Sequence, residues 1–213
     1  MTDSIARRVR TLLVALAAAA CAAGCATNRL VDHQANPAFV GKPFKRVLVV
    51  AVTSENVLGR IYEDRMVALL GQRGVRGIPG YAALGSTGAV DEATLRAVIA
   101  KTGADAVLIT RTIAVDQATV TSPGETAFVG IGWGGFYGFY SGVWKSVYVP
   151  PQTQDVGPPV STSETRLFDA RSGELAWRGA IATQDRDGRS DTASDMQQYA
   201  GIVFDAMAGD GVI

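Results

Sequence analysis

The chain has little of the chemistry on which most enzymes and metal proteins depend. Its 213 residues include one histidine, His33, and two cysteines, Cys21 and Cys25, both near the N-terminus. A histidine-based triad would have to recruit His33 from a polar N-terminal stretch, and no Gly-x-Ser-x-Gly turn accompanies it. A single histidine also leaves too few nitrogen and sulfur ligands for a zinc site. We therefore expect no catalytic residue, no metal site and no cofactor.

The chain also lacks a long, strongly apolar run, but it has a short one near its N-terminus. Arg7, Arg8 and Arg10 precede an alanine-rich stretch that carries no charge from Thr11 through Thr27. Alanine gains little on transfer to hydrocarbon, and a permanent span needs about 20 strongly apolar residues. A basic stretch before a short apolar run is typical of an export signal, which we predict over residues 1–24. The Arg7-Arg8 pair leaves twin-arginine export open as a minor alternative.

The apolar run ends in Ala22-Ala23-Gly24-Cys25, which resembles a lipobox, although Ala22 stands where most lipoboxes have leucine. The resemblance implies that Cys25 receives diacylglycerol and becomes the N-terminus of the mature protein. It also implies transfer to the outer membrane, because Ala26 occupies the position at which an aspartate retains lipoproteins at the inner membrane. Cys21 is a weaker lipidation candidate, and cleavage without lipid attachment remains the alternative interpretation.

Charge and cysteine content restrict the possible partners of the mature protein and the interactions that can stabilise it. Removing residues 1–24 leaves 17 basic and 19 acidic side chains, a net charge of −2. A nearly neutral protein offers no electrostatic footprint for nucleic acid. No free thiol remains besides Cys25, so we expect no disulfide, and stability must come from the hydrophobic core. About 190 residues suffice for one domain with such a core.

The remaining sequence predicts a tether followed by a single α/β domain. Residues 25–44 are polar and contain Pro37, Gly41 and Pro43, so we interpret them as a lipidated N-terminus and tether. Apolar periodicity and capping residues in 45–213 predict the order β-α-β-α-β-β-β-α. We expect a mixed five-stranded sheet that is parallel in its first half, with the first strand central and helices on both faces. The expected elements are strands near 47–52, 75–78, 106–110, 163–168 and 175–182, and helices near 55–72, 91–102 and 192–207.

This arrangement resembles the TolB N-terminal-like domain found in several envelope lipoproteins, including activators of penicillin-binding proteins. The resemblance is carried by Arg46–Val52, by Gly103–Leu108, and by the pattern Asp169-x-x-Ser172-Gly173-x-x-x-Trp177. It covers roughly residues 45–213 and contains no catalytic motif. It implies a periplasm-facing accessory protein.

An insertion at 126–160 does not have the pattern of a core element. Six glycines and eight aromatic residues lie between Phe128 and Tyr148. Because glycine disfavours helices, we expect a long loop or an irregular strand extension. Exposed aromatic side chains there would form a contact surface for a partner protein or a glycan, or the loop would fold back and cover the sheet. The candidate contact residues are Trp133, Phe136, Tyr137, Phe139, Tyr140 and Trp144.

Acidic residues offer two further candidate sites. Glu63 and Asp64 lie beside Arg60 and Arg65 in a predicted helix, where surface ion pairing is the simplest interpretation. Residues 185–191 resemble a calcium loop but have glycine at the wrong position, so we interpret them as a solvated turn.

These features favour a non-enzymatic outer-membrane lipoprotein that binds or assists an envelope partner from the periplasmic side. A carboxylate hydrolase acting on peptidoglycan or glycan, and a component of an oligomeric secretion assembly, are the alternatives.

Overall fold

The computed structural model of the chain describes residues 28–53, 55–87, 89–115, 132–141, 160–184 and 193–213. The elements, in chain order, are β1 (Asn28–Ala35), β2 (Arg46–Val52), α2 (Asn56–Gln72), β3 (Arg76–Pro79), α3 (Gly80–Leu84), α4 (Glu92–Thr102), β4 (Ala106–Val115), α5 (Gly132–Ser141), β5 (Val160–Asp169), β6 (Leu175–Gln184) and α6 (Ala193–Gly209).

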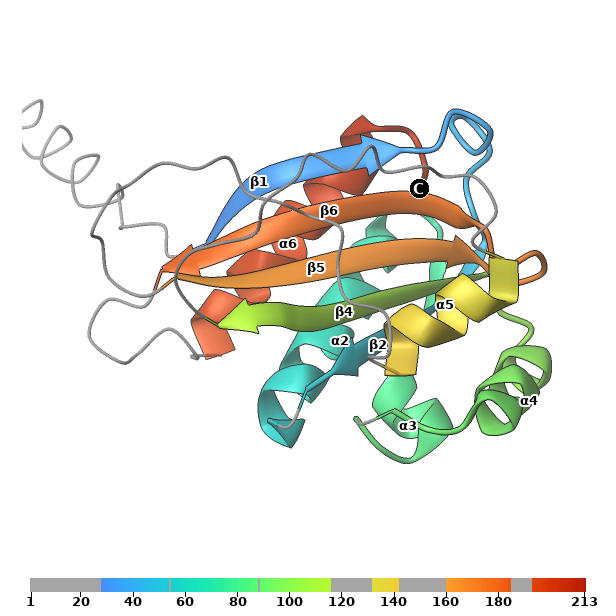
Figure 1. Cartoon of the computed structure of the whole chain (residues 1–213). Coiled ribbons are helices and arrows are strands. Elements are labelled where there is room, and N and C mark those ends of the chain that lie inside the picture. The colour runs from blue at the N-terminus through green and yellow to red at the C-terminus, as the bar shows by residue number, and fades with distance from the viewer. Residues whose placement is uncertain (1–27, 54, 88, 116–131, 142–159, 185–192) are drawn as a thin grey trace, which may run out of the picture.

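The described strands form one mixed, six-stranded sheet in the order β1-β6-β5-β4-β2-β3 (Figure 1). Strand β2 pairs in parallel with both β3 and β4, and all other pairs are antiparallel. This confirms the predicted fold class, the central position of the first predicted strand, and the C-terminal hairpin. The sheet has one strand more than the five expected.

The additional strand is β1, and it corrects the prediction of a tether over residues 25–44. Strand β1 pairs with β6 from Asn28, opposite Thr183, to Ala35, opposite Trp177. An edge strand needs only one partner and can present polar side chains to solvent, so its sequence reads as polar. The turn residues that suggested a tether follow the strand, where Gly41 adopts a φ of 75°. Residues 28–35 therefore belong to the sheet, whereas the domain was expected to start at residue 45.

Asn28 fastens the start of β1 to two other elements. Its Nδ2 donates to the carbonyl oxygen of Asp195 at 2.9 Å and to Oε1 of Gln198 at 3.2 Å, both in α6. Its Oδ1 accepts a hydrogen bond of 2.7 Å from the Thr183 hydroxyl in β6. These contacts fix the strand at its first residue.

We expect Asn28→Ala to lower the free energy of unfolding by about 1–3 kcal/mol, because it leaves buried polar partners without hydrogen bonds. Urea unfolding measures this loss. Arg29→Ala, at an exposed position of the same strand, is the matched control and should change stability by less than about 0.5 kcal/mol. Equal effects of the two changes would contradict the position assigned to β1.

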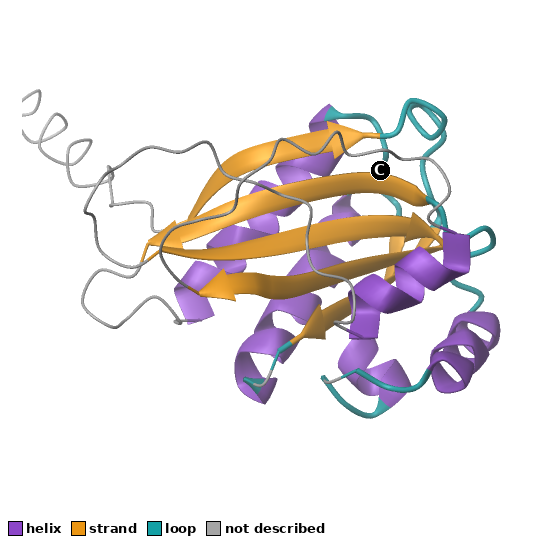
Figure 2. Ribbon diagram, in the orientation of Figure 1, coloured by secondary structure: helices purple, strands orange, loops and turns teal. Residues whose placement is uncertain are grey.

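Helices cover both faces of the sheet (Figure 2). Strand β2 serves both cores, because side chains alternate between faces along a strand. Val47, Val49 and Ala51 pack in the core beneath α2 and α6, whereas Leu48 and Val50 pack in the core beneath α4 and α5. The two crossover helices thus lie on opposite faces, as the parallel order predicts.

Both ends of α4, which was expected near residues 91–102, have residues that helix ends favour. Asp91 caps α4 by accepting a 2.9 Å hydrogen bond from the backbone N–H of Thr94. Gly103 ends the helix in the left-handed conformation with a φ of 63°.

Helix α5 corrects the prediction of a loop in the glycine-rich insertion. Its residues Phe136, Phe139 and Tyr140 recur at helical spacing and are all completely buried. Phe136 and Phe139 lie 4.9 and 6.1 Å, between ring centres, from Phe168 in β5. Burial of three aromatic rings outweighs the low helix propensity of glycine, which costs about 1 kcal/mol per residue relative to alanine.

Candidate functional site

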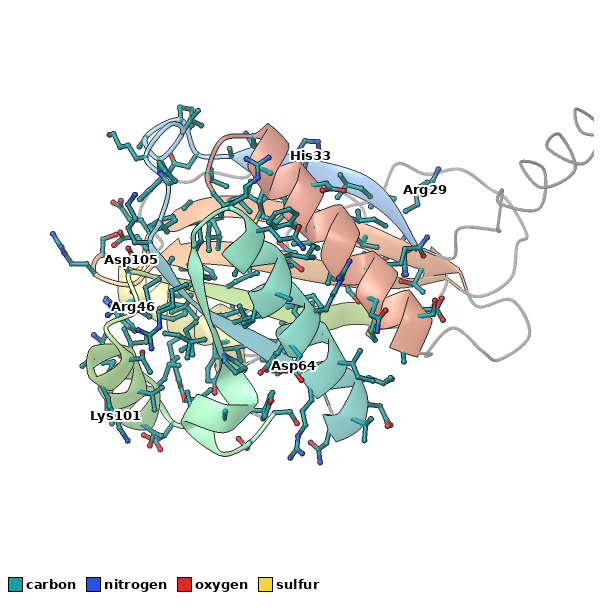
Figure 3. All side chains as sticks on the ribbon, turned by 180° about the vertical axis from the view of Figure 1, so that it is seen from behind. Arg29, His33, Arg46, Asp64, Lys101 and Asp105 are labelled. Carbon is teal, nitrogen blue, oxygen red and sulfur yellow. The ribbon has the colours of Figure 1, made fainter. Side chains whose placement is uncertain are left out.

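The predicted lipidation site, Cys25, lies outside the described residues. In the sequence, only Ala26 and Thr27 separate it from Asn28, the first residue of β1. We call this end of the sheet, with Asn28, Thr183 and the N-terminus of α6, the proximal end. Figure 3 places Arg29 at this end, with Arg46, Lys101 and Asp105 at the opposite end of the molecule.

We call that opposite end the distal end. Strands β2, β3, β4 and β6 begin there, β1 and β5 end there, and α2, α4 and α6 return to it. It consists of residues 36–46, 72–76, 101–105, 169–175 and 209–213.

The structure divides the aromatic residues predicted to contact a partner. Phe136, Phe139 and Tyr140 are buried in the core, so they stabilise the fold and present no surface to a partner in this structure. Trp133 and Tyr137 are half-buried, and a contact role for them stays a prediction. Trp144 lies outside the described residues.

The half-buried rings have partners within the protein. The Trp133 indole N–H donates to the carbonyl oxygen of Arg171 at 3.1 Å, and the guanidinium of Arg96 lies 3.7 Å from its ring centre. The Tyr137 hydroxyl donates to the carbonyl oxygen of Val90 at 3.2 Å. Helix α5 is therefore held at several points along its length.

Glu63 corrects the prediction of a surface ion pair. It is completely buried, and its two carboxylate oxygens accept hydrogen bonds from the backbone N–H of Ala51 at 2.9 Å and of Tyr81 at 2.8 Å. Asp64 is exposed and accepts a 3.0 Å hydrogen bond from the Tyr81 hydroxyl. The two neighbouring carboxylates have different partners and do not form an acid–base pair.

Glu63 occupies the place where open α/β sheets most often bind ligands, beyond the carboxyl end of a central parallel strand. Here the carboxylate joins the end of β2 to the start of α3. Gly80 permits this approach, because a Cβ at that position would lie 2.6 Å from the carbonyl oxygen of Val49 and 3.2 Å from Glu63 Oε1. The protein's own backbone thus fills this edge of the sheet.

Burial raises the pKa of Glu63 from 4.5 to about 7, although its backbone hydrogen bonds oppose the shift. The folded protein therefore binds a proton that the unfolded chain releases above pH 4.5. The free energy of unfolding should decrease by roughly 3 kcal/mol as the pH rises from 4.5 to 7, and this contribution should then stay constant.

Urea unfolding across this pH range tests the effect. We expect Glu63→Gln, which cannot titrate, to remove this part of the pH dependence. Asp64→Asn is the matched control and should retain it. An unchanged pH profile in Glu63→Gln would show that another group titrates.

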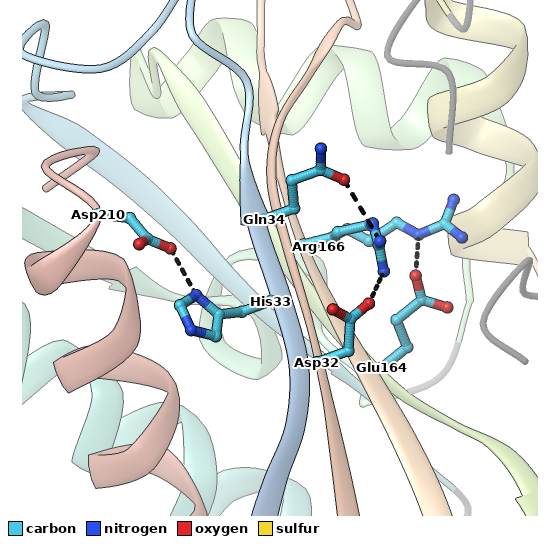
Figure 4. A network of polar contacts seen from close by, with 7 residues as sticks. Asp32, His33, Gln34, Glu164, Arg166 and Asp210 are labelled. Carbon is cyan, nitrogen blue, oxygen red and sulfur yellow. Dashed lines mark hydrogen bonds and ion pairs between the residues drawn. The ribbon is translucent and has the colours of Figure 1, made fainter. Parts of the chain in front are cut away.

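His33 is exposed, but it belongs to the sheet and not to a tether. It lies in β1, and its Nδ1 is 2.8 Å from Oδ2 of Asp210 (Figure 4). The same oxygen accepts a 2.7 Å hydrogen bond from the indole N–H of Trp177 in β6. Asp210 therefore joins the edge strand, the residues just after α6 and the core.

The sequence interpretation missed a cluster of charged side chains on the face of the sheet that α5 covers. We call it the arginine cluster. Arg166 in β5 lies opposite Arg178 in β6, and Arg111 in β4 lies opposite Glu164 in β5. The Arg166 Nε donates to Glu164 Oε1 at 2.7 Å. The Arg178 Nη1 donates to Asp32 Oδ2 in β1 at 2.5 Å (Figure 4). The Arg178–Asp32 ion pair thus cross-links β6 to β1 at the edge of the sheet, whereas the Arg166–Glu164 pair lies within β5.

Two members of the arginine cluster also hold α5. Arg111 Nη1 donates to the carbonyl oxygen of Phe139 at 2.6 Å, and the Arg166 guanidinium lies 4.1 Å from the centre of the Phe139 ring. Burial lowers the pKa of Arg111, and the nearby charge of Glu164 opposes that shift. The sequence offered one signal for this cluster. Glu164 and Arg166 are two residues apart in a predicted strand, so their side chains are expected on the same face of the sheet.

Within the described ranges, no three histidine, cysteine, aspartate or glutamate side chains gather as metal ligands would. Among the helices that the structure describes, none is long and apolar enough to cross a bilayer. The calcium-like segment 185–191 lies outside the described residues.

The chain is similar to two solved structures at low sequence identity. One is the PelC dodecamer from Paraburkholderia phytofirmans, with 11% identity over 87% of this chain and 99% of that chain, and a TM-score of 0.42. The other is lipoprotein GNA1162 from Neisseria meningitidis, with 14% identity over 78% of this chain and 99% of that chain, and a TM-score of 0.38. Likenesses at this level do not assign the chain to a family.

No model of a known protein family matches the chain, and no curated protein matches its sequence. The resemblance to the TolB N-terminal-like domain therefore stays a prediction.

Proposed function

We propose that this protein is a lipoprotein of the bacterial outer membrane that faces the periplasm and serves as a non-enzymatic binding or accessory module for an envelope partner. The observation that carries the proposal is the short distance between Cys25 and the first strand. A predicted export signal ends at Cys25, and the sheet begins only three residues later. A lipid on Cys25 would hold the folded domain directly against the bilayer.

The hydrogen bonds at the start of β1 support the proposed anchor. A lipid anchor holds a domain in place only if the strand that follows it is itself fixed, and Asn28 at the start of β1 is bonded to both β6 and α6. The distal end then points away from the bilayer, roughly one strand length from it. An eight-residue strand spans about 27 Å.

Three carboxylates that lie on the sheet or beside it have structural partners. Glu63 accepts backbone N–H groups, Glu164 pairs with Arg166, and Asp210 binds His33 and Trp177. This distribution favours a binding role over acid–base catalysis.

Crosslinking of intact envelopes, followed by affinity purification of the tagged protein, tests the binding role. We expect the same partner to be recovered reproducibly from the native protein, and at much lower yield from Cys25→Ser. Recovery of no reproducible partner would contradict the proposal.

A further inference from the structure

The distal end gathers basic side chains in a protein whose mature net charge is slightly negative. It carries seven basic and four acidic side chains, so the rest of the mature chain has ten basic and fifteen acidic ones. The basic residues are all exposed except Arg46, which is half-buried: Lys42, Lys45, Arg46, Arg73, Arg76, Lys101 and Arg171. Positive charge is therefore concentrated at one end of the molecule.

The fold itself uses most of the acidic side chains at this end. Asp105 accepts the backbone N–H groups of Lys45 and Arg46, each at 2.8 Å. Asp169 accepts the N–H of Arg171 at 2.9 Å in the β5–β6 turn, and Asp210 binds His33 and Trp177. Asp205, the next acidic residue on α6, lies about one turn before the distal end.

The basic side chains, in contrast, form no ion pairs here. Among the described residues, no carboxylate lies within 4.0 Å of any of the seven, since the ion pairs involve only His33, Arg96, Arg166 and Arg178. Arg46 donates to the carbonyl oxygens of Thr102 and Gly103, which leaves its charge uncompensated. Unpaired like charges on one surface repel each other, and an anionic partner relieves this repulsion.

A pocket of about 310 Å³ opens among these charges. Its basic lining residues are Lys45 and Arg73, both exposed, and the remaining lining is apolar or glycine: Pro43, Phe44, Gly74, Val75 and Ile213. A hollow lined partly by apolar side chains and partly by two exposed basic ones suits a side chain that is apolar itself and has carboxylates beside it.

From this arrangement we infer that the distal end binds an acidic protein segment, with an apolar side chain in the pocket and carboxylates on Lys45 and Arg73. The inference rests on the proposed function for its orientation, because the anchor at Cys25 points this end away from the bilayer. The binding chemistry depends only on the distal residues.

The test uses the mature protein in detergent micelles and a short fluorescent peptide of glutamates around one leucine. We expect binding that weakens strongly between about 50 and about 300 mM salt, as unscreened charge pairing requires. The double change Lys45→Gln and Arg73→Gln should weaken binding about tenfold or more. A peptide of glutamines around leucine should not bind.

The matched control is Arg29→Gln with Arg65→Gln, which removes the same charge at exposed positions outside the distal end. It should bind the acidic peptide like the unmodified protein, and both variants should melt at nearly the unmodified temperature. Equal weakening by both pairs, or equal binding of the glutamine peptide, would overturn the inference. Charge-dependent binding to peptidoglycan sacculi without peptide binding would also overturn it, in favour of a cell-wall partner.

The outcomes separate this inference from the proposed function. Failure to bind peptide by a protein that carries lipid on Cys25 would remove the acidic partner and leave the anchor. Peptide binding by a protein without lipid would leave the site and remove its orientation.

Discussion

Replacing Cys25 by serine is expected to abolish lipid attachment and so to remove the protein from the outer membrane. Each methylene that a lipid buries in the bilayer contributes about 0.8 kcal/mol to membrane binding, and even one whole acyl chain gives only marginal binding. Serine has no thiol to receive diacylglycerol, so every chain of the anchor is lost. The variant should no longer incorporate radiolabelled palmitate, and the precursor should persist with residues 1–24 uncut.

Cys21→Ser is the matched control, because it removes the other thiol of the same apolar run. It should leave palmitate incorporation and membrane attachment unchanged. Loss of palmitate incorporation in Cys21→Ser, with incorporation retained in Cys25→Ser, would move the lipid to Cys21. An unchanged mature mass in Cys25→Ser would remove the anchor altogether.

Trp177→Ala is expected to cause the largest loss of stability of any single change in the core. The indole is completely buried and packs between the sheet and α6. Its truncation removes a large apolar surface, leaves a cavity and deprives Asp210 of a hydrogen bond, at a cost of about 3–5 kcal/mol. Thermal unfolding should show a decrease in Tm of about 10 °C.

Trp177→Phe separates the two contributions. It keeps most of the ring but loses the N–H donor to Asp210, so it should cost about 1–2 kcal/mol. The indole lies over Gly179, where a Cβ would collide with the ring, so the site is already closely packed. A cost below about 1 kcal/mol for Trp177→Ala would contradict this packing.

The parallel half of the sheet and the C-terminal hairpin could be predicted because local sequence dominates their formation. Val47–Val52 is a continuous β-branched and apolar run, which is typical of a strand buried on both faces. Asp169 accepts three hydrogen bonds within its own turn, so the hairpin connection is encoded nearby.

The missed elements depend on distant partners. Strand β1 is stabilised by β6, about 150 residues away in sequence, and its own residues are largely polar. Helix α5 forms because Phe136 and Phe139 pack against Phe168, which outweighs glycine's preference for other conformations. Neither result follows from periodicity alone.

The candidate sites were predictable only in part, for a related reason. The sequence identified Glu63 as an interesting carboxylate, but not that it points inward between β2 and α3. The basic distal end is assembled from several separate segments, so no sequence window contains it. Its charge asymmetry becomes visible only in the folded structure, which brings these segments to one end of the sheet.

A lipid on Cys25, followed directly by β1, predicts a fixed orientation of the domain, with the proximal end at the bilayer and the distal end away from it. Since Cys25 carries the only thiol of the mature chain and lipid would occupy it, a cysteine introduced elsewhere can be labelled uniquely. A fluorophore on Arg29→Cys, in vesicles with headgroup spin labels, should be strongly quenched. The same fluorophore on Lys101→Cys, at the other end of the molecule, should not be quenched (Figure 3). Equal, weak quenching at both positions would mean that the domain moves freely on a long tether, and would contradict the account.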